Sequence, residues 1–531
     1  MNEMSCSGQP MAPSALTQQF SSYIFTVNSP TRRRSKLPIT ASQPDTTASQ
    51  SAATTVVQPG KVTLPIRKVP GDYGLPVLGA IRDRHDFFYN QGKEEFFKSR
   101  MLKYESTVFR ANMPPGPPMA SDPRVIVLLD GKSFPILFDV SKVEKKNLFV
   151  GTYMPSTDLT GGYRVLSYLD PSEPRHEKLK KLLFYHLMVR KDHVLPAIES
   201  SYGPLFEKLA EEVAVNGKAD IGTFVNQTNF EFVCRSLCGL SPADTSLGSD
   251  GPDLIFKWLL FQLAPLQSLG LPKYIDDLLL RTIGFPPALI KKDYQRLYDV
   301  FFRSCDFLWE EARRMSLSTE DACHNILFTI CFNTFGGLLF IIPNLIRYVG
   351  LAGPAVQEEL AREVRAAIAS NGGKLTMAAI GAMPLVSSVV YETFRIEPPV
   401  PFQYGKAKQD LVVESHDEAF EVKAGEMLFG YQPFATRDPR IFDRAEEFVA
   451  DRFKREGGED LLKQVFWSNG RESESPTVEN KQCAGKDFVV LVARLFLVEL
   501  FRHYDSFEVE IQRKTPSGAT IFLTSLKKAS F

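Results

Sequence analysis

The chain has 531 residues, of which 44% are hydrophobic and 11% aromatic, so it is long enough and apolar enough to bury a large core. Its 62 Lys and Arg residues balance its 62 Asp and Glu residues, and this balance argues against nucleic acid or a strongly anionic surface as a partner. The 7 cysteines are odd in number and stand in mostly apolar surroundings, which predicts a reduced compartment and no disulfide framework.

Residues 1–58 differ in composition from the rest of the chain. They are rich in Ser, Thr, Pro and Gln, carry a basic run at 32–36, and contain only Glu3 and Asp45 as acids. This composition is typical of a transit peptide, and its many hydroxylated residues favour a plastid over a mitochondrion. A disordered tail without a targeting role is the alternative. An apolar signal-peptide core is missing, which argues against secretion.

The most apolar stretch covers residues 326–346 and approaches the length of a membrane span. Asn333, Gly336, Gly337 and Pro343 interrupt it. Because lipid would leave the amide of Asn333 unpaired, this pattern favours a helix buried inside a large domain.

Helical patterns dominate the second half of the chain. Residues 358–370 form an amphipathic pattern that ends at an Asn-Gly-Gly sequence, a second helix lies between Pro384 and Pro398, and residues 488–504 predict a long buried helix. Residues 410–432 alternate in polarity and turn at 423–425, which predicts short strands and a hairpin. No second linker or repeat follows Lys61, so we expect one mainly α domain with small β-sheets over residues 59–531.

Cys483 differs from the other cysteines because it lies in a polar, charged loop directly before the last apolar helix. Backbone N–H groups at a helix start favour a thiolate, as do nearby cations such as Lys481 and Lys486. A lone cysteine is more often structural, but this context predicts an iron-ligating thiolate.

Three elements in order support that interpretation. Glu392 and Arg395 are spaced i, i+3 on a predicted buried helix, Asp-Arg-Phe follows at 451–453, and Cys-x-Gly follows at 483–485. Their order and spacing resemble the conserved regions of cytochromes P-450. The resemblance implies the cytochrome P-450 fold of a haem-thiolate protein, in which Glu392, Arg395 and Arg452 form a buried structural network.

Two departures from the ordinary cytochrome pattern narrow the resemblance. An insertion after Phe466 and Gly470 moves the cysteine about ten residues further along, and the helix at 331–337 has no acid beside Thr334 to relay protons to dioxygen. Both features are similar to the plant cytochromes P-450 that metabolise fatty acid hydroperoxides: allene oxide synthases, hydroperoxide lyases and divinyl ether synthases. The similarity to allene oxide synthases is carried by the stretches at 112–118, 132–157, 159–180, 331–337, 414–428 and 475–496.

The resemblance implies a haem b cofactor and assigns residues to it. Cys483 is the expected axial ligand of the iron, and Lys145, His176, Lys180 and Lys481 stand where relatives hold the haem propionates. A lysine or histidine aimed at a carboxylate forms a charge-assisted hydrogen bond, so the residue types fit this role. From the residues alone, Lys145, Lys180 and His176 would be ordinary surface residues.

The resemblance also implies residues that contact the substrate. Asn333 matches an asparagine that hydrogen-bonds the hydroperoxide; from the sequence it is a buried amide that needs a partner, and back-bonding within its helix is the alternative. Phe149 stands where synthases tend to have Phe and lyases Leu, and its aromatic face suits a carbon-centred radical or cation. Leu339 replaces a lysine of many relatives, which leaves open how the far end of the substrate is held.

We therefore expect an allene oxide synthase, a hydro-lyase acting on fatty acid hydroperoxides such as 13-hydroperoxy-octadecatrienoate on the route to oxylipins and jasmonate. It would need neither dioxygen, NADPH nor a reductase, and it could associate peripherally with a plastid membrane. Hydroperoxide lyase or divinyl ether synthase is the nearest alternative. A reductase-dependent monooxygenase and a non-catalytic haem or lipid-binding protein are more distant ones. The sequence leaves open the 9- versus 13-hydroperoxide preference and the oligomeric state.

Overall fold

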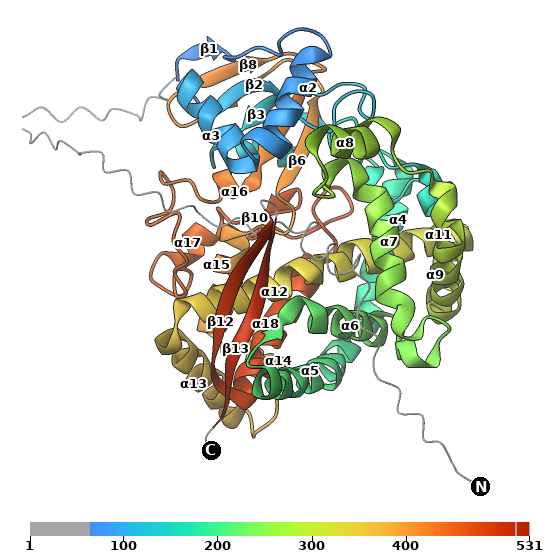
Figure 1. Cartoon of the computed structure of the whole chain (residues 1–531), viewed down its shortest axis with the longest axis vertical. Coiled ribbons are helices and arrows are strands. Elements are labelled where there is room, and N and C mark those ends of the chain that lie inside the picture. The colour runs from blue at the N-terminus through green and yellow to red at the C-terminus, as the bar shows by residue number, and fades with distance from the viewer. Residues whose placement is uncertain (1–63, 516–517, 530–531) are drawn as a thin grey trace, which may run out of the picture.

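A computed structural model describes residues 64–515 and 518–529 of the chain. The predicted transit peptide at 1–58 therefore lies outside the described residues, as does Cys6. The described part is mainly helical and contains small sheets (Figure 1), which confirms the predicted fold class.

The helices and strands follow one another along the whole described chain. The α-helices are α2 (Leu78–His85), α3 (Lys93–Tyr104), α4 (Pro174–Arg190), α5 (Val194–Asn216), α6 (Ile221–Val233), α7 (Gly251–Leu263), α8 (Lys273–Leu278), α9 (Lys291–Ser304), α10 (Trp309–Arg314), α11 (Thr319–Leu327), α12 (Gly336–Ala352), α13 (Pro354–Ser370), α14 (Met377–Gly381), α15 (Pro384–Ile396), α16 (Gln432–Ala435), α17 (Gly458–Leu462) and α18 (Lys486–His503). The strands are β1 (Ile66–Lys68), β2 (Val108–Asn112), β3 (Arg124–Leu128), β4 (Val143–Glu144), β5 (Ala219–Asp220), β6 (Phe402–Ala407), β7 (Leu411–Glu414), β8 (Ala419–Val422), β9 (Met427–Tyr431), β10 (Phe466–Trp467), β11 (Gly470–Arg471), β12 (Tyr504–Thr515) and β13 (Gly518–Lys528).

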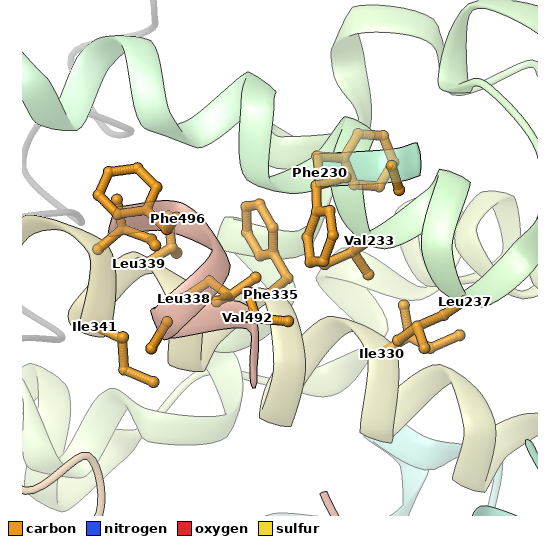
Figure 2. Packing of buried hydrophobic residues seen from close by; sticks show 14 of the residues in the cluster. Phe230, Val233, Leu237, Ile330, Phe335, Leu338, Leu339, Ile341, Val492 and Phe496 are labelled. Atoms are coloured by element: carbon orange, nitrogen blue, oxygen red, sulfur yellow. The ribbon is translucent and has the colours of Figure 1, made fainter. Parts of the chain in front are cut away.

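The core is built around one continuous helical rod, Thr319–Ala352, made of α11, a π-helical segment at Phe328–Phe335, and α12. The rod is long and apolar enough to cross a membrane, but 72% of its most apolar window is buried inside the protein. This burial agrees with the predicted core helix. Figure 2 shows side chains of the rod among those of α6 and α18, with Phe335 and Phe230 in edge contact at 6.2 Å between ring centroids.

The π-helical segment is a local widening of the rod. Thr334 Oγ1 donates a hydrogen bond to the carbonyl of Thr329, five residues earlier, at 3.0 Å. Single π-helical turns inside α-helices occur mostly at functional sites, because the extra residue re-aims its neighbours. Asn333 lies in this segment.

The other predicted helices are confirmed with small changes at their ends. The pattern at 358–370 lies inside α13, which begins earlier because Pro354 fits the first turn of a helix and ends at Ser370 before the Asn-Gly-Gly sequence. The helix after Pro384 is α15, and the long apolar pattern is α18.

The hairpin predicted within residues 410–432 forms between β7 and β8, but these strands are joined at 415–418 and not at the predicted turn, 423–425. The chain turns there, with Gly425 at a positive φ of 86°, but the strands on the two sides of the turn belong to different sheets. β8 pairs antiparallel with β7 and parallel with β1, whereas β9 lies in the five-stranded sheet of order β2-β3-β9-β6-β4. Alternating polarity predicted the positions of the strands, but two strands joined by a short turn need not pair with each other.

Each end of the molecule combines helices with a small sheet. Figure 1 shows β2, β3, α2 and α3 at one end, and α5, α13 and α14 with the long β12–β13 hairpin at the other. β10 and the segment that leads to α18 lie between them. The Cys483 loop lies next to β10, because the N–H of Cys483 donates to the carbonyl of Ser468.

Candidate functional site

The Cys483 loop is held against the short β10–β11 hairpin. The N–H of Cys483 donates to the carbonyl of Ser468 at 3.2 Å, and Gln482 Nε2 donates to the carbonyl of Arg471 at 2.7 Å. Gly470 permits this close approach, because a Cβ there would lie 2.5 Å from the side-chain carbonyl carbon of Gln482. The inserted residues therefore form a loop whose ends are held by these hydrogen bonds, and Cys483 stays directly before α18.

The predicted activation of Cys483 is only partly correct. Burial raises the pKa of the Cys483 thiol, while the N–H of Gly485 and the charge of Lys180 oppose the rise. Lys481 and Lys486, which the sequence suggested as activating cations, instead donate to backbone carbonyls. The backbone N–H at the start of α18 therefore favours the thiolate as predicted, whereas Lys481 and Lys486 do not. A metal ion at the sulfur would supply the missing positive charge, because coordination deprotonates a thiol.

Four predicted cofactor residues gather beside this loop. Lys145, His176 and Lys180 are only 3%, 1% and 1% exposed, and Lys481 is partly buried. They are thus not the surface residues that their types alone would suggest. Their convergence from three separate segments supports the site that the resemblance implied.

Each buried ammonium group is bonded to neutral acceptors. Lys145 Nζ donates to the carbonyl of Tyr404, and Lys481 Nζ donates to the carbonyls of Leu166 and Leu169 at 2.8 and 2.6 Å. Within residues 64–515 and 518–529, no carboxylate forms an ion pair with Lys145, Lys180 or Lys481. Burial, followed by mutual repulsion, lowers the pKa of Lys145 and Lys481 to about 7 each.

The same surroundings affect Lys180 and His176. Burial lowers the pKa of Lys180 to about 8, and burial together with the two neighbouring lysines lowers the pKa of His176 to about 3. Nδ1 of His176 is buried and has no hydrogen-bond partner in the described part of the chain. Buried cations and an unpaired imidazole nitrogen are stabilised by anions, so this cluster fits the two carboxylates of a haem.

A second buried network is centred on Glu392. Arg395 binds its carboxylate through two hydrogen bonds of 2.8 Å, and Arg452 Nε reaches both oxygens at 3.0 Å. The N–H of Val449 also donates to it at 2.8 Å. Glu392 and Arg395 are fully buried, and Arg395 further donates to the carbonyl of Ala445 at 2.7 Å. The network fixes the segment before the Cys483 loop onto α15, which is the structural role expected of these residues.

Phe149 belongs to a group of aromatic rings at the π-helical segment. It makes edge contacts with Tyr168 at 5.6 Å and with Phe332 at 5.9 Å between ring centroids. Phe332 in turn stacks on Phe328 at 4.6 Å. Tyr168 and Phe332 therefore hold the ring of Phe149 beside the helical segment that carries Asn333. The sequence alone did not predict these contacts.

The prediction that Asn333 is buried is wrong. Its side chain is exposed, although Thr334 and Phe335 next to it are buried. Gly337, one turn further, is on the same open face, because a Cβ there would meet nothing within 4 Å. Among the described residues the Asn333 amide has no hydrogen-bond partner, so it is available to a bound molecule. Leu339, by contrast, is 3% exposed and lies in the core on the side of Phe496 (Figure 2).

Sequence reasoning missed Asn480. Its backbone carbonyl and side-chain oxygen both accept from Lys180 Nζ, at 2.6 and 3.0 Å. Its position in a polar loop gave no signal, because turns commonly contain asparagine for local reasons.

Comparison with known proteins agrees with this site. The Cytochrome P450 family model matches residues 337–529, which contain the Glu392 network and Cys483. The chain is 60% identical to allene oxide synthase 1, chloroplastic, of Solanum lycopersicum over 94% of its length and 92% of that relative. It is 58% identical to allene oxide synthase, chloroplastic, of Arabidopsis thaliana over 90% of its length and 92% of that relative. It is also 57% identical to the chloroplastic allene oxide synthase of Linum usitatissimum over 93% of its length and 90% of that relative.

The fold, the cysteine loop and the buried cations thus define a cytochrome P450, an enzyme class that carries haem. More narrowly, the chain belongs to the allene oxide synthase family of these enzymes. The chloroplastic names of these relatives also place it in the plastid, as predicted.

The Glu392 network yields a stability prediction. Glu392→Gln leaves two buried guanidinium groups without their carboxylate, so we expect the free energy of unfolding to fall by about 3–5 kcal/mol. Urea unfolding followed by circular dichroism measures this change. The matched control is Glu446→Gln, whose partner Arg437 lies 2.9 Å away but whose side chain is 64% exposed. That exposed pair should contribute less than about 1 kcal/mol, and equal effects of the two substitutions would contradict the prediction.

Proposed function

We propose that this protein is an allene oxide synthase: it converts a fatty acid hydroperoxide into an allene oxide that feeds oxylipin and jasmonate synthesis. The observation that carries the assignment is the close similarity to several allene oxide synthases over nearly the whole chain. The reaction class is that of a hydro-lyase, because the substrate loses one molecule of water. We take residues 1–58 as the transit peptide and residues 59–531 as the catalytic domain.

The cofactor is proposed to be haem b. Cys483 would be its axial ligand, and Lys145, His176, Lys180 and Lys481 would hold its propionates, since the three lysines present positive charge without an ion-paired carboxylate and neutral His176 offers a buried ring nitrogen without a partner. When bound, the haem iron supplies the chemistry that cleaves the O–O bond of the hydroperoxide. The protein residues then determine how the substrate is oriented and which product forms.

Asn333 and Phe149 are the proposed substrate-contacting residues. The Asn333 amide is exposed on the open face of the rod, where it can donate to and accept from a hydroperoxide group. Phe149 is held in edge contact with the neighbouring Phe332, so its ring face is fixed beside that amide's helical segment. A fixed aromatic face stabilises an electron-deficient carbon and limits the ways in which the substrate skeleton can rearrange.

Independence from a reductase is part of the proposal. A proton relay for dioxygen would need an acid in the π-helical segment, and residues 328–335 contain none. Thr334 is also engaged with a backbone carbonyl in its own segment. The hydroperoxide brings its own oxidised oxygen, so the reaction balances without dioxygen or NADPH. Hydroperoxide lyase is the second candidate, because it would use the same substrate and the same cofactor site.

Peripheral membrane association is proposed through one apolar surface. The segment before α2 exposes large apolar side chains, and the region of α8 exposes others close by. We call them the apolar rim: Leu75, Val77, Leu78, Tyr274, Ile275, Leu278 and Ile283. The two segments are held together by the ion pair of Arg84 and Asp277 at 2.6 Å, and α2 and α8 are neighbours in Figure 1. A lipid substrate partitions into membranes, which makes a bilayer surface the proposed partner of the rim.

The decisive experiment mixes the purified, haem-loaded protein with 13-hydroperoxy-octadecatrienoate in the absence of NADPH. We expect rapid consumption of the hydroperoxide and ketols and cyclopentenones as the products of allene oxide breakdown. Short-chain aldehydes would instead identify a hydroperoxide lyase, and turnover only with NADPH and a reductase would identify a monooxygenase. A parallel reaction with the 9-hydroperoxide measures the positional preference.

Substitution of Phe149 tests its role in product choice. Phe149→Leu removes the fixed aromatic face but keeps an apolar side chain, so we expect a shift from allene-oxide-derived products toward aldehydes. Product analysis by mass spectrometry measures the ratio. Tyr168→Phe is the matched control, because it keeps the ring that supports Phe149. An unchanged product ratio in Phe149→Leu would remove this residue from the mechanism.

The apolar rim predicts the effect of added charge on membrane binding. Leu75→Glu and Ile283→Glu each place a carboxylate at a position that is 69% or 67% exposed, and we expect each to reduce vesicle binding by about tenfold. Sedimentation with phosphatidylcholine–phosphatidylglycerol vesicles gives the bound fraction. Val215→Glu, at a 79% exposed position on α5, is the control and should bind like the unchanged protein. Equal loss in all three variants would show that the rim is not the docking surface.

A further inference from the structure

Asn480 makes an unusual number of hydrogen bonds for one loop residue. Its Oδ1 atom accepts from the N–H groups of Thr477 and Gln482 at 3.1 and 3.2 Å, and from Lys180 Nζ at 3.0 Å. Its Nδ2 atom donates to the carbonyl of Ser475 at 3.0 Å. Its own carbonyl accepts a second bond from Lys180 Nζ at 2.6 Å. One side chain thus organises the end of the insertion and holds a distant lysine.

The contact with Lys180 joins two parts of the chain that are 300 residues apart in sequence. Lys180 lies on α4, and Asn480 lies three residues before Cys483. A lysine side chain has several rotatable bonds, and a buried ammonium group without acceptors is strongly destabilised. Asn480 supplies two acceptors at once and thereby selects one orientation of the Lys180 side chain.

The charge of Lys180 is not neutralised by this contact. An ammonium group has three N–H donors, and Asn480 occupies two of them with neutral oxygens. No other acceptor for Lys180 Nζ is found within residues 64–515 and 518–529. The third donor and the full positive charge are therefore left for an anion, and the lysine is held in place before that anion arrives.

We infer that Asn480 is a positioning residue for the cofactor: it orients Lys180 toward a haem propionate and couples helix α4 to the loop that carries Cys483. The inference rests on the proposed function, since it needs a haem at this site. It assigns a task to the insertion that distinguishes this loop from that of ordinary cytochromes P-450. The insertion places Asn480 against α4, where its two oxygens hold the Lys180 side chain. Without them, the flexible lysine side chain could place its charge in several positions.

A double-mutant cycle on haem release tests this coupling. The variants are Lys180→Met, Asn480→Ala and the combination of the two. The rate of haem transfer to excess apomyoglobin is read from the Soret band. We expect each single substitution to speed haem release by about tenfold, because each weakens one charge-assisted hydrogen bond. In the Lys180→Met background we expect Asn480→Ala to speed release by only about threefold, because its bond to Lys180 is already gone and only its bonds within the loop remain to be lost.

Gln482→Ala is the matched control in the same loop. It removes the bond to the carbonyl of Arg471, which holds the loop to the hairpin, but it does not contact Lys180. Its effect on haem release should add fully to that of Lys180→Met. Thermal unfolding of the haem-free variants provides a second reading, in which Asn480→Ala should be more destabilised than Gln482→Ala, because its side chain loses more hydrogen bonds.

The outcomes separate the possible roles. Additive effects of Asn480→Ala and Lys180→Met would show that Asn480 only shapes the loop, and the inference would be overturned. If Asn480→Ala does not fold, the cycle is repeated with Asn480→Ser, whose shorter hydroxyl can still accept from a loop N–H group but gives up the side-chain contact with Lys180. That variant should still be coupled to Lys180, and additivity there would again reject the inference. Failure of the unchanged protein to bind haem would reject the proposed function instead, before any variant is compared.

Discussion

The structure depends on a concentration of positive charge that the chain buries next to Cys483. Lys145, Lys180 and Lys481 are held by backbone carbonyls and an amide. Burial lowers the pKa of all three, and repulsion from a neighbouring lysine further lowers the pKa of Lys145 and Lys481. Such an arrangement costs free energy unless an anion compensates it, since buried charges are normally paired. The fold accepts this cost because the cluster is supported from several sides: α4, the segment before it, and the insertion before α18. A dianionic cofactor turns the same cost into binding energy.

The cation cluster and the Glu392 network have different structural roles at the site. The network is internally neutralised to a large extent, with one carboxylate between two guanidinium groups, and it fixes the segment after α16 without needing any ligand. The cation cluster, by contrast, needs an anionic ligand to compensate its charge. The Cys483 loop can therefore keep its position through the β10–β11 hairpin and the Glu392 network, while the proposed contacts with the cofactor come separately from Lys180 and its neighbours.

Much of the fold and site could be predicted because the responsible signals are local or belong to a family pattern. Apolar periodicity located α13, α15 and α18, and the spacing of Glu392, Arg395 and Cys483 identified the class. The failures are cases in which a distant partner decides. The strands beside the turn at Gly425 pair with strands from distant parts of the chain, β8 with β1 and β9 with β3, and Asn333 is exposed within a π-helical segment that its sequence did not predict. Asn480 was missed because its significance lies in Lys180, which is remote in sequence.

The rod through the core explains how one helix serves both packing and chemistry. Its widened segment turns Asn333 and Gly337 toward an open face, while Phe335 and Leu339 stay in the core. Because Leu339 is packed with core side chains, a charged anchor for the far end of the substrate does not come from this position. In the proposed substrate complex, Asn333 and Phe149 are then the residues that orient the hydroperoxide end. We therefore propose that this protein distinguishes hydroperoxide isomers by the fit of the acyl chain to the site and not by a charged anchor at Leu339.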